Sequence, residues 1–410
     1  MKFMALFFSL STLGVSFAGP LHMDLEMTSE EYKLLLEKKS QSMNKNMKAD
    51  DPAITEALAI GSRLSKWIAL VNSGRTPETA IRLTSATARR GIPIDKPNQY
   101  SPSTIQTETR SIFSDLPKEM SDVLLGTGEL PTDIPLDDET FIKFARKIDK
   151  NYQSAARYKA VDEFRSYYIE AARKDVRGYY YLTHNKITAY DLRDVSLIPR
   201  SKVKPIKEAL SLVCLNATAE AKVCRSEVEM AFKENKVGLF YKKFILSAKR
   251  NWDSFFKIPV SARRKDVNWS DGVTTVPFNT PKIPKFGPYL KDNIEDEFRW
   301  KGWALKLTFG SYPNGPLLKF EAGAVPHVNG LGGNQIIMDS NQPIEEYESQ
   351  WTIRHEFGHV IGLPDCYHEF YDVKARAYVN YQLDVTDLMC SRAGNMKERI
   401  YLELKEAYKK

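Results

Sequence analysis

HEFGHVIGLPD, residues 355–365, is the stretch on which the interpretation of this chain depends. It begins inside an amphipathic run, Tyr347 to Ile361, that predicts a helix. Residues four apart share one face of a helix, so the imidazoles of His355 and His359 can bind one metal ion. Glu356 follows the first histidine directly, which places its carboxylate beside the metal, where it can take a proton from bound water.

The same stretch predicts a third ligand. Gly362 can adopt the left-handed conformation that ends a helix, so that Asp365 returns toward the metal. Three protein ligands with an open fourth position are typical of a catalytic zinc site, and two imidazoles with a carboxylate suit Zn2+. His368 competes with Asp365 for this role, but the spacing from Gly362 favours Asp365. Two histidines on a helix can also be ordinary surface residues. The chain has only six histidines, so finding two of them four residues apart favours the metal site.

The elongated motif resembles the signature of the metzincin clan of zinc endopeptidases, H-E-x-x-H-x-x-G-x-x-H/D followed by a methionine turn. Aspartate in the last position is similar to the snapalysin-type variant. The resemblance implies that His355, His359 and Asp365 bind the zinc and that Glu356 is the general base. It also implies that Met389, in DVTDLMCS, is the turn methionine beneath the metal, although a methionine filling core space fits the same position.

The resemblance covers residues 256–410 and implies an α+β domain with a mixed sheet, an active-site helix, a methionine turn and a C-terminal helix. Residues 322–339 resemble its edge-strand region, which would pair with an extended peptide substrate. His327, in that region, is expected to be a loop histidine. Tyr367, beside the ligand loop, can bond a reaction intermediate or simply pack its ring. Predicted strands and further helices are Val273–Pro277, Ala304–Phe309, Leu317–Phe320, Gln335–Met338, Tyr289–Trp300 and Lys397–Lys409.

The chain has four cysteines, which allow three pairings. Cys366 and Cys390 flank the ligand and the turn methionine, which a metzincin-like arrangement brings together, so that resemblance implies a disulfide between them. Cys214 and Cys224 would then pair across a short turn between two helices. A rival idea, that Cys214 or Cys224 reaches the zinc as an inhibitory thiolate, would leave an odd thiol.

The region before residue 256 is predicted to be mainly α-helical. Residues 1–18 have the pattern of a cleavable signal peptide, which predicts a secreted or periplasmic protein; an uncleaved anchor is the alternative. Residues 19–137 are expected to form helices at Met27–Lys48 and Asp51–Ser73, followed by a Pro/Ser/Thr-rich linker, or a loosely packed wrap, between Gly91 and Asp138. Residues 138–255 are expected to form a basic helical domain. Residues 19–255 can be a removed propeptide of a zymogen, a targeting domain or a fused scaffold.

Composition places the chain among folded proteins, since 42% of its 410 residues are hydrophobic and 27% are charged. Residues 141–250 contain 24 Lys and Arg against 12 Asp and Glu, a net charge of +12. This segment can dock weakly onto an anionic surface or be a solvated face, and no specific nucleic-acid motif or transmembrane segment accompanies it. The leading hypothesis is a secreted zinc endopeptidase acting on proteins or peptides. The alternative is an extracellular binding or adhesion protein with a vestigial or structural zinc site.

Overall fold

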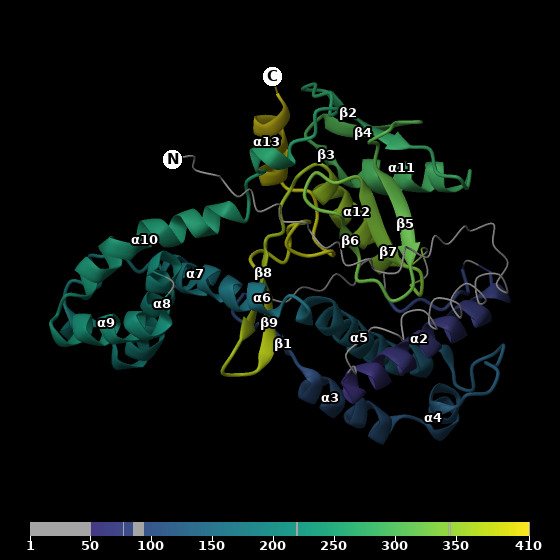
Figure 1. The fold of residues 1–410 in the computed structure, drawn as a ribbon, viewed down its shortest axis with the longest axis horizontal. Helices are drawn as coiled ribbons and strands as arrows, with labels where there is room; N and C mark the ends of the chain where they lie inside the picture. The colour runs from purple at the N-terminus through teal and green to yellow at the C-terminus, as the bar shows by residue number, and fades with distance from the viewer. Residues whose placement is uncertain are drawn as a thin grey trace, which may run out of the picture.

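The chain forms a mixed α and β structure, as the sequence predicts. This computed structural model describes residues 51–76, 78–84, 94–218, 220–342, 344 and 346–409. Figure 1 shows two groups of helices and a C-terminal part in which strands and helices pack together. The predicted signal peptide and the helix predicted at Met27–Lys48 lie outside the described residues.

A first helical group is built from α2 (Pro52–Ser73), α3 (Pro102–Asp115), α4 (Lys118–Leu125) and α5 (Asp138–Asp162). Helix α2 begins where Asp51 caps the backbone N–H of Ala53 at 2.9 Å and proline occupies the first turn. Its buried face carries Trp67, whose ring meets Phe141 of α5 edge to face at 5.1 Å. Helices α2, α3 and α5 therefore share one hydrophobic core.

The linker predicted between Gly91 and Asp138 is wrong over most of its length, because it contains strand β1 (Asn98–Tyr100), α3 and α4. Ser101 and Thr104 form a capping box at the start of α3. Only Ile105, Thr109 and Ile112 of this helix are buried. The helix thus buries one residue per turn, and one of the three is a threonine. Its apolar periodicity is too weak to predict a helix among so many Ser and Thr residues.

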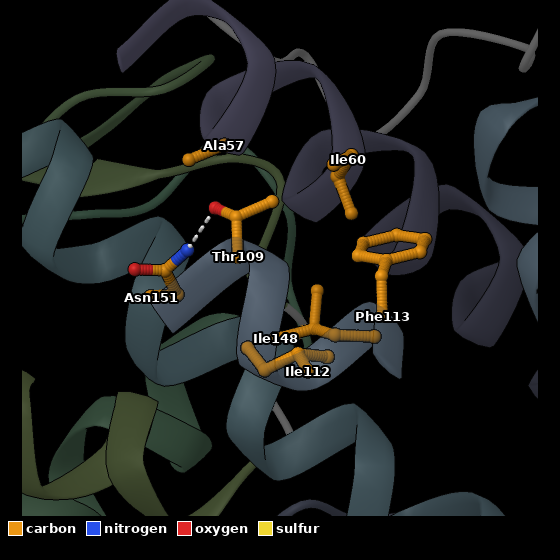
Figure 2. Close-up of a pocket in the computed structure, with 7 residues that line it drawn as sticks. All are labelled: Ala57, Ile60, Thr109, Ile112, Phe113, Ile148 and Asn151. Carbon is orange, nitrogen blue, oxygen red and sulfur yellow. Dashed lines mark hydrogen bonds between the residues drawn. The ribbon is translucent and has the colours of Figure 1, made fainter. Parts of the chain in front are cut away.

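The contact between α2, α3 and α5 leaves a cavity of about 10 Å³ (Figure 2). Its polar side is closed by Asn151, whose amide donates to the Thr109 hydroxyl at 2.8 Å. A space of this size holds at most about one water molecule. The cavity is a packing feature, and it is too small for a substrate.

A second helical group follows, at the left of Figure 1. It contains α6 (Arg165–Ala171), α7 (Arg177–His184), α8 (Arg200–Thr218), α9 (Ala221–Lys233) and α10 (Val237–Ser254), with short 3-10 turns at Ala172–Lys174 and Val195–Leu197. Helices α7 to α10 enclose a core of their own, and a disulfide joins Cys214 of α8 to Cys224 of α9. The expected domain of residues 138–255 is thus divided, since α5 packs with α2 and α3.

Across the described residues, every helix is too short or too polar to cross a bilayer.

The C-terminal part holds two sheets that meet end to end. Their strands are β2 (Val273–Asn279), β3 (Arg299–Trp300), β4 (Trp303–Gly310), β5 (Leu317–Glu321), β6 (His327–Val328) and β7 (Gln335–Asp339). The orders are β2-β4-β3 and β5-β7-β6, with β2 parallel to β4, β5 parallel to β7, and β6 an antiparallel edge strand. The N–H of Asn279 donates to Pro316 at 2.8 Å, which links the end of β2 to the start of β5.

Three helices belong to these sheets: α11 (Phe286–Glu297), α12 (Tyr347–Val360) and α13 (Glu398–Tyr408), preceded by a 3-10 turn at Val260–Ala262. Each helix and each of the four predicted strands lies where the sequence indicated, within three residues at either end. Helix α12 is buried along most of its length, and Phe357 meets Phe298 edge to face at 5.4 Å. The core thereby fixes the helix that carries the two histidines.

A third sheet joins a strand that precedes α3 to two strands near the C-terminus. Strand β1 pairs with β9 (Ala377–Gln382), which pairs with β8 (Tyr367–Asp372), all antiparallel. Tyr100 lies opposite Tyr378, and their rings stack at 5.5 Å. The first helical group is therefore tied to the C-terminal part by backbone hydrogen bonds.

The disulfide between α8 and α9 gives the first prediction. Replacing Cys214 and Cys224 together by serine should lower the free energy of unfolding by about 2–3 kcal/mol, because a 10-residue loop is no longer closed in the unfolded chain. Denaturant unfolding under non-reducing conditions measures this, with far-UV circular dichroism as the check that the helices still form. An unchanged midpoint would mean that the bond is absent from the purified protein.

Candidate metal centre

Helix α12 presents two imidazoles to one carboxylate. His355 and His359 are 3% and 7% exposed, and their ring planes cross at 88°. The Nε2 atom of each ring lies 3.1 Å from Oδ1 of Asp365. The two histidines and the aspartate proposed as ligands are therefore brought to one point.

Backbone carbonyl groups decide which ring nitrogen faces that point. His355 Nδ1 lies 2.8 Å from the carbonyl oxygen of Leu388, and His359 Nδ1 lies 2.8 Å from that of Leu363. A carbonyl only accepts, so each Nδ1 carries the proton and donates it. In the neutral rings, Nε2 then offers a lone pair toward Asp365, which is the state that binds a metal.

The end of α12 explains how Asp365 reaches the histidines. Gly362 has φ +85°, its N–H donates to His359 O, and the N–H of Leu363 donates to Gly358 O, each at 3.0 Å. This is a Schellman ending, which turns the chain back beside the helix. A Cβ on Gly362 would also lie 2.8 Å from the carbonyl oxygen of Ala262, so glycine is required both for its φ and for the space.

Glu356 lies beside the two histidines without belonging to the triangle that they form with Asp365. One potential ligand atom from each of His355, Glu356 and His359 falls within 4.8 Å of the others. Glu356 is 3% exposed, and its Oε2 has no hydrogen-bond partner among the described residues. Buried carboxylate oxygens without a partner are uncommon in folded proteins, and a catalytic role is one reason for them.

The charges of the site depend on one another. Burial by itself would lower the pKa of His359, but the adjacent Asp365 carboxylate outweighs it and raises that pKa to about 9. Burial likewise opposes ionisation of Asp365, yet the two imidazoles hold its pKa far below the usual range. Without a metal, a proton therefore binds His359 and bridges it to Asp365.

The separations of these atoms suit a shared metal ion. Tetrahedral zinc bonds of 2.0–2.1 Å would separate two ligand atoms by about 3.3–3.4 Å, and each imidazole Nε2 lies 3.1 Å from Asp365 Oδ1. The donor set of two imidazoles and a carboxylate is one that zinc accepts, and the unpartnered oxygen of Glu356 lies beside it.

Met389 packs directly beneath the helix. Its side chain is fully buried, and a Cβ on Gly358 would overlap its sulfur. Its carbonyl oxygen accepts from the N–H of Cys366 at 3.1 Å, and the disulfide between Cys366 and Cys390 joins the same two segments. Asp387 lies beside these cysteines, but their sulfurs are bonded to each other, so this group does not form a second metal site.

The remaining candidates lie away from the ligands or beside them. His368 has both ring nitrogens engaged, with the Tyr381 hydroxyl at 2.8 Å and the Ala171 carbonyl at 2.9 Å, so it does not compete with Asp365. His327 is exposed on β6, and its Nδ1 lies 2.8 Å from Val325 O. The ring of Tyr367 stacks over His355 at 6.4 Å.

Sequence reasoning missed the residues that support the ligand strand from outside. Arg157 of α5 and Tyr100 of β1 both bond Glu369 of β8. They lie more than 200 positions from Glu369 in the chain, and no spacing rule connects them. No signal in the sequence points to them. The burial of Glu369 in a short strand, which calls for partners, becomes visible only in the fold.

Comparison of the chain with protein-family models, with curated proteins and with solved structures gives no match.

The contact between Gly358 and Met389 gives a prediction about packing. Gly358→Ala should destabilise the protein by about 1–3 kcal/mol, because the new methyl group displaces a fully buried side chain. In a Met389→Ala background the same substitution should cost far less, since the space is then free and alanine favours the helix. Denaturant unfolding of the unsubstituted protein, the two single variants and the double variant measures the coupling between the two positions. Additive changes in the free energy of unfolding would contradict the contact.

The raised pKa of His359 predicts how the metal-free protein responds to pH. A histidine whose pKa is raised by folding contributes stability that is complete below its unfolded pKa of about 6.5. That stability is lost as the pH rises through about 9. Chelator-treated protein should therefore melt at progressively lower temperature across this interval, and His359→Gln should remove the dependence. A flat profile in the unsubstituted protein would argue against the pair with Asp365.

Proposed function

We propose that this chain is a secreted zinc-dependent endopeptidase. The observation that carries the proposal is the convergence of two imidazole nitrogens on one carboxylate oxygen, each nitrogen 3.1 Å from that oxygen, beside a buried glutamate with an unpartnered oxygen. Three protein ligands leave a fourth position for water or substrate, which distinguishes catalytic from structural zinc sites.

The fold is compatible with the proposal. An antiparallel edge strand, β6, precedes the active-site helix α12, Met389 follows it beneath Gly358, and α13 ends the described chain. That is the order of elements that the resemblance to metzincins implied. The two disulfides suit an oxidising compartment, in line with the signal-peptide pattern of residues 1–18.

In the proposed mechanism, His355, His359 and Asp365 hold the ion. Zinc, when bound, acidifies a water molecule and polarises the scissile carbonyl. Leu388 and Leu363 keep the imidazoles oriented through their carbonyl groups. Glu356 takes the proton of the attacking water on its free oxygen and delivers it to the departing amine.

The substrate would be a protein or peptide. Among the described strands, β6 lies at the edge of its sheet. We expect an extended peptide to pair with its outer side through backbone hydrogen bonds, which would bind peptides with little regard to sequence. The rival function, a binding or adhesion protein in which the site is vestigial, predicts no turnover. Purified protein that carries one zinc per chain and cleaves casein in a chelator-sensitive way would exclude that rival.

The role of Glu356 gives a direct test. Glu356→Gln should keep the fold and the zinc but lose at least about a hundredfold in peptide hydrolysis, as expected when a general base is removed. Zinc content by atomic absorption and peptide turnover, measured on the same preparation, separate metal binding from proton transfer. Near-normal turnover would show that Glu356 is not the base.

The ligand set has its own test. Asp365→Ala should abolish stoichiometric zinc, because one of three ligand atoms is removed. His327→Ala is the matched control, since this histidine is exposed and bonds only within its own turn. Equal zinc in both variants would overturn the assignment of Asp365.

A further inference from the structure

The ligand loop continues directly into a strand that the helical region holds. Asp365 lies two residues before β8, and side chains alternate along the strand, so Tyr367 and Glu369 point to the same face. Tyr367 stacks on His355. A displacement of β8 would therefore move both the Tyr367 ring, which stacks on His355, and the loop that carries Asp365.

Glu369 anchors that face to the helical region. Its carboxylate receives Arg157 of α5, whose Nε lies 3.1 Å from both carboxylate oxygens and whose Nη2 also bonds it. Tyr100 of β1 donates its hydroxyl to the same carboxylate, and Asn380 of β9 contributes a bond at 3.3 Å. Glu369 is 7% exposed, so its charge depends on these partners.

Helix α5 also has a contact with the C-terminal part that lies away from β8. One and a half turns earlier on the same helix, Tyr152 donates to Asp339 Oδ2 at 2.7 Å. Asp339 ends β7 and also accepts from the N–H groups of Gly323 and Asn341. This contact is buried as well, but it does not involve β8.

We propose that Arg157 is a positioning residue of the metal centre. By holding Glu369 it fixes β8, and through β8 it fixes Asp365 and Tyr367 against the two histidines. The inference rests on the proposed zinc site and extends it: the helices that supply Arg157, together with the strand that supplies Tyr100, are a lasting part of the enzyme rather than a segment removed before zinc binds.

The test compares zinc affinity in the full-length secreted protein, measured by competition with a chromogenic chelator at fixed pH. Arg157→Met should weaken zinc binding by about 10- to 100-fold, the range seen when groups that orient metal ligands are lost. Arg157→Lys should recover part of this loss, because one charged bond to Glu369 is restored. Tyr152→Phe, the control on the same helix, should bind zinc within about twofold of the unsubstituted protein.

Two further measurements keep the result interpretable. Circular dichroism and melting temperature establish that each variant is folded. If Arg157→Met does not fold, the double variant Arg157→Met, Glu369→Gln removes the unpaired buried charge, and its zinc affinity decides the matter. Folded variants at position 157 that bind zinc as tightly as Tyr152→Phe would overturn the inference. An unsubstituted protein that takes up no zinc would instead refute the proposed function.

Discussion

The structure depends on one arrangement: two buried imidazoles that face one carboxylate, which is partly exposed. Each imidazole alone would leave a buried ring nitrogen without a partner, which is unfavourable. Together they need only a proton or a metal ion between them. The Schellman turn at Gly362, the carbonyl groups of Leu363 and Leu388, and the sulfur of Met389 beneath Gly358 all serve to hold that geometry.

The sequence predicts this part of the molecule well because its determinants are local. The histidines lie one turn apart, glycine follows at the helix end, and the aspartate comes three residues later, so helix geometry alone brings them together. The strands from Val273 to Met338 are likewise short apolar runs bounded by turn residues. The two cysteine pairs in the structure are those that their spacing and the metzincin resemblance suggested.

What the sequence does not predict is long-range. Helix α3 has few apolar positions and α4 is only eight residues long, so neither gives a clear periodic pattern. Both are stable through packing in the core that they share with α2 and α5. The boundary expected at residue 137 separates α5 from α2, but the two helices share a core. The amino-acid composition changes at that position, whereas the packing does not. The bonds from Arg157 and Tyr100 to Glu369 join positions that only the assembled fold brings near.

The pairing of β1 with β9 has a consequence for how the protein comes into being. Contacts such as that of Tyr100 with Glu369 span 269 residues, so almost the whole polypeptide must be synthesised before they can form. The early helices can form before that, but strand β1 has no partner until β9, residues 377–382, has been made. The bonds from Tyr100 and Arg157 that hold the strand after Asp365 are therefore among the last to form, once the helices before them are in place.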